Sequence, residues 1–382
     1  MKIAPFAVEQ WMNAHENDCE LNLAETCVES LTVEQLLELT GQRDAWLRAT
    51  LPLKLTYGPI VGSDRLRSAV AALYESRQAE RVLITHGAAG ANALVYQALV
   101  EPGDRVICFA PTYQQHYSIP ESLGAEVQVL HLSEPEGYLP DLEQLARLAS
   151  APTKLISLTN PNNPTGSLMP ETTLRAIAQI ADRAGAYVLS DEVYRGTSQV
   201  GDGLSPSLAD LYPRAISIGS MSKAYSLAGL RLGWMYGPHE VLQAAEVHRD
   251  YNTISVGMLD DLLAAIALES ADKILGRSRR IVRANLATLD AWIRSEPTLS
   301  YVKPHAGTVT LLKYAFDIPS REFCLRLLKE TGVLFTPGSA FGIEGSVRIG
   351  YANGHHVLAA GLPRVSAFLQ KLAMEGSRAA VA

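Results

Sequence analysis

The sequence has no long apolar segment, and this absence limits the classes of protein it can encode. No stretch approaches the ~18 consecutive apolar residues that a membrane-spanning helix needs. The amino terminus carries polar and acidic residues where a signal peptide would have an apolar core. We therefore expect a soluble, cytoplasmic protein that does not associate with membranes.

Cysteine and concentrated positive charge are also scarce. The chain has four scattered cysteines, Cys19, Cys27, Cys108 and Cys324, which lack the spacing of a metal site and predict reduced thiols and no bound metal. Its 33 Lys and Arg residues face 40 Asp and Glu residues, which gives a formal net charge of −7 without any basic block. The sequence therefore predicts no nucleic-acid partner.

Apolar residues are plentiful, at 47% of 382 residues, which supports a large folded core and excludes wholesale disorder. Short β-rich runs alternate with amphipathic helical stretches through the middle of the chain. These runs cover residues 81–85, 105–109, 127–130, 154–158, 186–190, 215–218 and 232–236. The alternation predicts an α/β fold with a mostly parallel central sheet flanked by helices.

The pattern changes after about Asp260, which indicates a second domain. A long helical stretch at 273–293 precedes three apolar runs separated by helical segments, at 309–314, 333–336 and 347–351. We therefore expect a smaller α+β domain at the carboxyl end. The predicted parts are an N-terminal arm and helix associated with the small domain (1–45), a large domain (46–265) and a small C-terminal domain (266–382).

Polar and glycine-rich loops follow the predicted strands, where parallel sheets bind their ligands. Residues 160–166 read Asn-Pro-Asn-Asn-Pro-Thr-Gly. The other loops are 86–90, 191–194, 219–223 and 229–233. Each loop alone is explained by a turn or a helix cap. Together they supply a candidate for every part of a pyridoxal phosphate site.

Such a site needs a lysine that holds the cofactor aldehyde as a Schiff base and an Asp that pairs with the pyridinium nitrogen. Lys223 and Asp191 are the candidates, and with Tyr194 they are the predicted catalytic residues. Asn163 and Tyr194 would donate hydrogen bonds to the ring oxygen, and Tyr113 would lie on the ring face. A phosphate cradle combines helix N-terminal amides with hydroxyls and an arginine. Its candidates are Gly87, Ala88, Ala89, Ser220, Ser222 and Arg231.

These motifs resemble the class I/II aminotransferases of pyridoxal-phosphate fold type I, and the likeness covers nearly the whole chain. The resemblance implies an enzyme that moves an amino group between an amino acid and a 2-oxo acid. It also implies a homodimer with shared active sites, because the segment around Tyr57 matches one that carries a tyrosine to the neighbouring subunit's phosphate. Arg348, in Val-Arg-Ile-Gly, matches the arginine that binds the substrate α-carboxylate.

Two segments depart from the family pattern and leave alternatives open. Residues 22–29 lack the usual glycine and carry Glu25, which either faces the substrate or is a solvated loop charge. If it faces the substrate, Glu25 with Glu29 or Asp250 would favour a positively charged side chain. Residues 249–255 are similar to a stretch of capreomycidine synthase, a relative that cyclises a hydroxylated arginine.

The alternative function is therefore a pyridoxal-phosphate-dependent cyclodehydratase or lyase that acts on an arginine-like amino acid. A third possibility is the effector-sensing domain of a transcription regulator. That possibility requires a DNA-binding module, and the ~45 acidic-leaning residues at the N-terminus provide no room for one.

Overall fold

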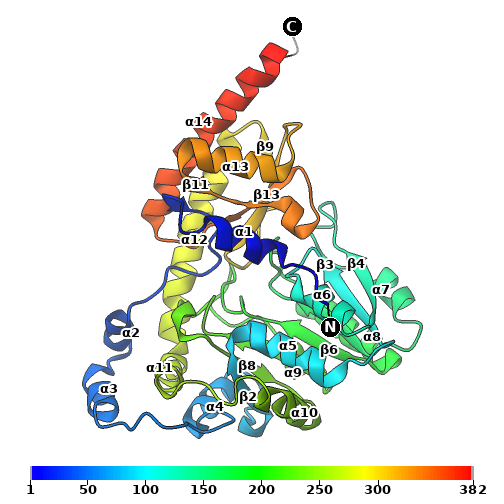
Figure 1. Cartoon of the computed structure of the whole chain (residues 1–382), viewed down its shortest axis with the longest axis vertical. Helices are drawn as coiled ribbons and strands as arrows, with labels where there is room; N and C mark the ends of the chain where they lie inside the picture. The colour runs from blue at the N-terminus through cyan, green and yellow to red at the C-terminus, as the bar shows by residue number, and fades with distance from the viewer. Residues whose placement is uncertain (1, 380–382) are drawn as a thin grey trace.

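The largest element of the computed structural model, which describes residues 2–379, is a seven-stranded sheet in the order β2-β8-β7-β6-β5-β3-β4 (Figure 1). The strands are β2 (Val82–His86), β3 (Arg105–Ala110), β4 (Glu126–His131), β5 (Leu155–Thr159), β6 (Tyr187–Asp191), β7 (Ala215–Ser220) and β8 (Leu232–Tyr236). Within this sheet β8 runs antiparallel to both neighbours, and the other pairings are parallel. The predicted α/β class with a mostly parallel sheet is confirmed.

Helices cover both faces of this sheet, which is why its central strands are almost entirely buried and largely apolar. In β5, Leu155 packs into the cluster under α5 (Gly87–Leu99) and α10 (His239–Asp250). The next residue, Ile156, packs into the opposite cluster under α7 (Leu142–Leu148), α8 (Glu171–Ala184) and α9 (Leu208–Leu211). Alternate residues of one strand thus meet two helical layers.

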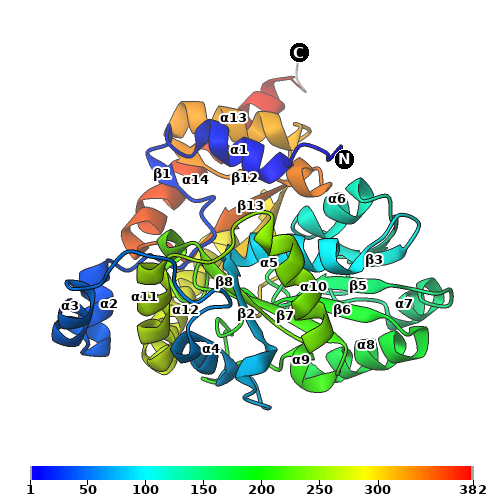
Figure 2. The ribbon, with the colours of Figure 1, turned by 60° about the horizontal axis from the view of Figure 1, so that its bottom comes forward.

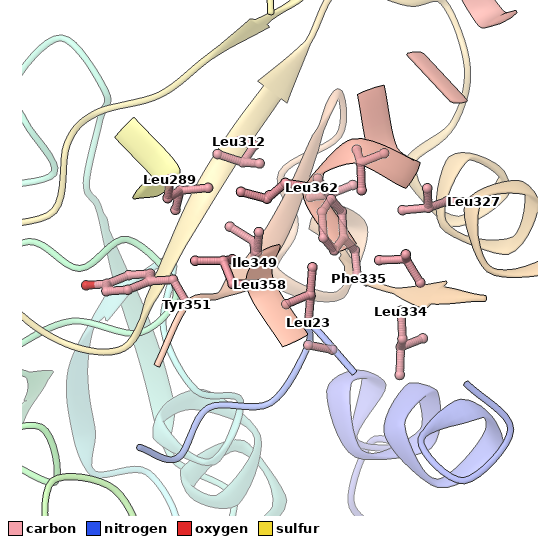
Figure 3. Close-up of a cluster of buried hydrophobic side chains, with 14 of the residues drawn as sticks. Leu23, Leu289, Leu312, Leu327, Leu334, Phe335, Ile349, Tyr351, Leu358 and Leu362 are labelled. Carbon is pink, nitrogen blue, oxygen red and sulfur yellow. The ribbon is translucent and has the colours of Figure 1, made fainter. Parts of the chain in front are cut away.

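The second unit is an antiparallel sheet in the order β12-β13-β10-β9. Its strands are β9 (Leu299–Ser300), β10 (Val309–Tyr314), β12 (Thr336–Pro337) and β13 (Ser346–Gly350). The long helices α12 (Ala271–Ser295) and α14 (His355–Ala379) and the helix α13 (Ser320–Thr331) pack around it. Figure 3 shows the shared core, in which Leu289, Leu312, Ile349 and Leu362 converge.

The N-terminal region differs from the predicted arm and one helix. Two helices, α1 (Ala7–His15) and α2 (Val33–Thr40), lie within residues 1–45, and α3 (Arg43–Thr50) begins there. Trp11 of α1 joins the core of the second unit, whereas Leu36 of α2 joins a cluster with α4 (Asp64–Ala71) and α11 (Met258–Glu269). Figure 2 draws α1 beside α13 and β12, well apart from α2 and α3. The prediction missed a helix because each of these helices has only eight or nine residues.

The apolar residues of α12 belong to two clusters. Ile274 and Leu275 pack with the helices beside the large sheet, and Val282 and Leu286 pack into the core of the second unit. We therefore propose that α12 links the large and small domains and that the division between them falls within this helix. Residue 1 of the predicted arm and residues 380–382 of the predicted small domain lie outside the described residues.

The remaining elements are short. They are α6 (Gln115–Ser122), β1 (Leu21–Asn22), β11 (Val333–Leu334), η1 (Ala79–Arg81), η2 (Ala228–Leu230) and η3 (Gly338–Phe341). β1 pairs with β11 in parallel and so ties the N-terminal segment to the second unit. Between residues 2 and 379, no helix is both long and apolar enough to cross a membrane.

Candidate active site

A cavity of about 510 Å³ lies at the carboxyl ends of the large sheet's strands and is closed by residues of the second unit and of α1. Twelve of the predicted site residues line it. They are Glu25, Ala88, Ala89, Tyr113, Asn163, Asp191, Tyr194, Ser220, Ser222, Lys223, Arg231 and Arg348. Gly87 begins α5 at its edge, and Tyr57 lies elsewhere on an exposed loop. One cavity therefore collects residues that are up to about three hundred positions apart in the sequence.

Asp191 is the last residue of β6 and is buried at the base of the cavity. Its Oδ2 accepts a hydrogen bond from Asn92 Nδ2 at 2.9 Å, and its Oδ1 accepts one from the Val193 amide at 3.2 Å. His116 Nε2 lies 3.7 Å from Oδ2, and the other ring nitrogen of His116 lies 2.7 Å from Ser157 Oγ. These contacts fix the carboxylate in one orientation inside the sheet.

Lys223 follows β7 and points its amine toward the N-terminal segment. Its Nζ donates to Thr26 Oγ1 at 2.5 Å and lies 3.6 Å from Cys27 Sγ. Burial works to lower the pKa of Lys223, but the neighbouring Cys27, Tyr194 and Glu25 groups outweigh it and the pKa is raised. The Lys223 amine therefore faces an acidic side of the cavity, where the carboxylate of Glu25 favours its protonated form.

Glu25 lies on that acidic side. Its Oε1 accepts hydrogen bonds from the amides of Thr26 at 2.6 Å and Cys27 at 2.9 Å. Burial works to raise the pKa of Glu25, but the charge on Lys223 and these amide donors lower it. The other two acidic candidates lie apart: Glu29 pairs with Arg277 at 3.4 Å, and the exposed Asp250 does not line the cavity.

The turn from β2 into α5 forms a cradle above Arg231. Gly87 has φ of +64°, a left-handed conformation that glycine adopts without strain. Gly233 of β8 lets this turn approach closely, because a Cβ there would lie 2.5 Å from the Gly87 carbonyl carbon and 2.7 Å from the Ala88 nitrogen. Among the residues that the structure describes, no side chain caps the first turn of α5. Its free amides, with Ser220, Ser222 and Arg231 nearby, form an anion site.

Arg348 of β13 closes the cavity from the second unit and is 2% exposed. Its Nη1 donates to Asn163 Oδ1 at 3.1 Å, and its Nη2 donates to the Ala24 carbonyl and to Thr336 Oγ1, both at 3.2 Å. Its Nε is buried without a partner among the described residues. A guanidinium with a free buried donor is suited to binding an anionic ligand.

Sequence reasoning missed several residues in the cavity or next to it that lie outside the recognised motifs. Thr26 and Cys27 contact Lys223, and Asn92 and His116 hold Asp191. Phe6, Glu9, Met12 and Glu16 reach the cavity from α1 and its ends. Thr26 and Cys27 directly follow Glu25, so their position beside a singled-out residue was a usable signal. The others give no local signal.

The arrangement fits pyridoxal phosphate. Asp191 is buried and held in place for a protonated ring nitrogen, and Lys223 lines the same cavity. The uncapped start of α5 with Ser220, Ser222 and Arg231 suits a phosphate. In the part of the chain from 2 to 379, no group of His, Cys, Asp and Glu side chains is placed to hold a metal ion.

Comparison with known proteins agrees with this arrangement. The family model for aminotransferase class I and II matches residues 31–359. Capreomycidine synthase of Streptomyces vinaceus is 30% identical over 94% of this chain and 92% of that protein. A probable aspartate/prephenate aminotransferase of Thermus aquaticus is 31% identical over 86% of this chain and 87% of that protein.

A solved structure is also similar. The crystal structure of a PLP-dependent aminotransferase from Streptococcus suis 89-1591 superposes with a TM-score of 0.93. It is 44% identical and covers 97% of this chain and 99% of that one. The chain belongs to the class I and II aminotransferase family, and it is a pyridoxal-phosphate-dependent transferase of fold type I.

Proposed function

We propose that this enzyme moves an amino group from an amino acid to a 2-oxo acid in the cavity described above. The observation that carries the proposal is the meeting of Lys223, Asp191 and Arg348 in one cavity of a chain that belongs to this family. Asp191 ends β6, Lys223 follows β7 and Arg348 lies in β13, and each residue supplies one requirement of the reaction. Together they hold the cofactor, keep its ring charged and bind the substrate.

Substrate binding starts at Arg348. Its unpartnered Nε and the Nη1 that contacts Asn163 are placed to grip the α-carboxylate. This contact would orient the substrate Cα toward Lys223. Pyridoxal phosphate, when bound, supplies an electron sink for negative charge that develops at the substrate Cα. Asp191 keeps that sink effective, because a buried carboxylate stabilises the proton on the ring nitrogen.

Lys223 is the proposed Schiff-base lysine and the group that moves the proton at the substrate Cα. Thr26 and Cys27 hold its amine on the cavity side, and the carboxylate of Glu25 balances its charge. Tyr194 lines the cavity next to Lys223 and is proposed to share a hydrogen bond to the ring oxygen with Asn163. Tyr113 is the proposed ring-stacking residue. Glu25 is proposed to lie on the substrate side of the cavity, beside the Lys223 amine.

The working unit is proposed to be a homodimer with shared active sites in the cytoplasm. Tyr57 is 76% exposed on a loop outside the cavity of its own chain. This exposure supports a role for Tyr57 at the phosphate of the partner subunit's site. The described cysteines are all free thiols, as suits a reducing compartment.

A second candidate is cyclodehydratase or lyase chemistry on an arginine-like amino acid. The observation that favours it is the 30% identity to capreomycidine synthase over nearly the full length of both chains. Both candidates use the same cofactor residues, so they differ in the fate of the substrate.

The test is to add one amino acid at a time to the cofactor-loaded enzyme without a 2-oxo acid. Transamination converts the bound cofactor stoichiometrically to pyridoxamine phosphate and releases the matching 2-oxo acid. Cyclodehydratase chemistry instead returns the cofactor unchanged and converts a hydroxylated amino acid into a cyclic amino acid and one water. Failure of all twenty amino acids and of hydroxylated arginines to change the cofactor or be consumed would contradict both candidates.

A further inference from the structure

The cavity holds more carboxylates than amino-group transfer uses, and the surplus comes from one helix. Glu9 and Glu16, here called the acidic edge, reach the cavity from α1 and its C-terminal cap. We propose, building on the function above, that the acidic edge selects a substrate with a long side chain ending in a positive charge. The substrate class is then arginine- or lysine-like amino acids.

The spacing of the acidic edge follows from helix geometry. Glu9 and Glu16 are seven residues apart, which places them about two turns and ~10 Å apart on one face of a helix. Met12 lies between them on the same face and also lines the cavity. The helix is fixed in place because Trp11, on its other side, is buried in the core of the second unit. The acidic edge is therefore presented to the cavity by a rigid element.

Glu9 is held in a fixed position that leaves one oxygen available. Tyr113 donates a hydrogen bond from its hydroxyl to Glu9 Oε1 at 2.7 Å, and the Tyr113 ring packs against Phe6 with centroids 4.6 Å apart. Within residues 2–379, neither Glu9 Oε2 nor the Glu16 carboxylate has a hydrogen-bond or ion-pair partner. Both can accept hydrogen bonds from a cation bound in the cavity.

The other charged residues of the cavity face the proposed cofactor site, the proposed α-carboxylate or each other. Arg231 lies at the phosphate cradle, and the partly unpartnered Arg348 faces the α-carboxylate. Lys223 and Glu25 balance each other. Burial lowers the pKa of Arg348 and Glu9 is among the acidic groups that oppose this, so Glu9 lies near that guanidinium. Neither carboxylate of the acidic edge, however, has a cation as a hydrogen-bond or ion-pair partner within residues 2–379, and a substrate cation would supply one. A second carboxylate on the substrate would instead be repelled there.

The cavity lining beside the acidic edge suits the aliphatic stem of a long side chain. Phe6, Val8 and Met12 present apolar surface beside the acidic edge. Arginine and lysine side chains bury their methylene stems against such surface while their charged ends remain paired. A short cationic side chain would not use this surface, so the geometry favours a long one.

The experiment compares charged amino acids with neutral amino acids of nearly the same shape. Dissociation constants for L-arginine and L-citrulline, and for L-lysine and L-norleucine, are measured on the cofactor-loaded enzyme by absorbance titration, with kcat/KM alongside. The variants are Glu9→Gln and Glu16→Gln, singly and together, because Gln keeps the size and the Tyr113 acceptor but removes the charge. Glu322→Gln, on the exposed face of α13 outside the cavity, is the matched control.

We expect the wild type and Glu322→Gln to bind the cationic member of each pair roughly tenfold or more tighter than the neutral one. The double variant should lose this advantage while its affinity for citrulline and norleucine stays unchanged. Equal affinities within each pair in the wild type, or tighter binding of glutamate, would overturn the proposal. So would an advantage that persists in the double variant. If the enzyme prefers glutamate and transaminates it, the proposed selectivity for cationic side chains is wrong, but the proposed amino-group transfer stands.

Discussion

At the residue scale, Asp191 is a buried carboxylate that its neighbours hold in position. Asn92, the Val193 amide and His116 surround its carboxylate. Asp191→Asn keeps the size but removes the charge that would stabilise a protonated ring nitrogen. We expect turnover to fall by roughly 100-fold or more with the fold retained. Steady-state kinetics with circular dichroism measures both.

The matched control is Asp182→Asn, which removes an exposed carboxylate from α8. It should leave turnover within about twofold of the wild type, as surface substitutions usually do. An Asp191→Asn enzyme that is as active as this control would show that Asp191 does not tune the cofactor ring.

Cys27 gives a prediction about pH. Burial raises the pKa of the Cys27 thiol to about 11, and the nearby Lys223 charge only partly opposes it. Because the raised pKa keeps the thiol protonated, Cys27 should react with iodoacetamide far more slowly at pH 8 than after unfolding. Its reaction should accelerate as the pH rises toward 11. Mass spectrometry of the Cys27 peptide measures this, and fast labelling of the folded protein at pH 8 would contradict it.

The residues that sequence could identify were those in recognisable local motifs. Lys223 and Arg231 lie in such motifs, and the structure places both in the cavity. Glu9 could not be identified, because its partner Tyr113 is 104 positions away and nothing near Glu9 indicates the contact. The same applies to Asn92, which reaches Asp191 across 99 positions.

At the element scale, the contact between β8 and the start of α5 forms the anion cradle. A methyl group at Gly233 would collide with the backbone of Gly87 and Ala88. Gly233→Ala should therefore displace the cradle and weaken binding of pyridoxal phosphate by roughly tenfold or more. Gly229→Ala, in the same Gly-Leu-Arg-x-Gly motif, has nothing within 4 Å of its added Cβ and should bind normally.

Cofactor dissociation constants, measured by fluorescence on stripped protein, distinguish the two variants. Equal affinity in both would mean that the close approach at Gly233 does not shape the cradle.

Helices and strands could be predicted where the hydrophobic pattern of a segment matched a single kind of surrounding, such as burial on both faces. The central strands of the large sheet are largely apolar because helices cover both faces, and the predicted runs overlap all seven strands of that sheet. The run 333–336 was predicted as one strand but forms β11 and β12, which pair with β1 and β13 respectively. Its residues are all buried, so the sequence carries no sign that two different sheets receive them.

At the scale of the whole molecule, the shared active site is the main expectation. Leu51, Leu55 and Tyr57 on one loop and Tyr251 on another are strongly exposed apolar or aromatic residues, a pattern typical of a surface covered by a partner. If Tyr57 serves the partner's site, Lys223→Ala and Tyr57→Ala proteins are each impaired, but mixing them restores activity. Each mixed dimer then contains one intact site.

After unfolding and refolding an equal mixture, activity should reach about a quarter of the wild-type value, since half the dimers are mixed and half their sites are intact. Each protein refolded alone is the control. If Tyr57 acted in its own subunit, no mixed dimer would hold an intact site and no activity would return.

The proposed function depends on Lys223 as the residue that carries the cofactor. The most direct measurement is borohydride reduction of the cofactor-loaded enzyme, followed by proteolysis and mass spectrometry of the peptides. We expect one phosphopyridoxyl group per chain, on the peptide that contains Lys223, and none on a Lys223→Ala protein treated in the same way. A stoichiometric label on any other lysine would contradict it.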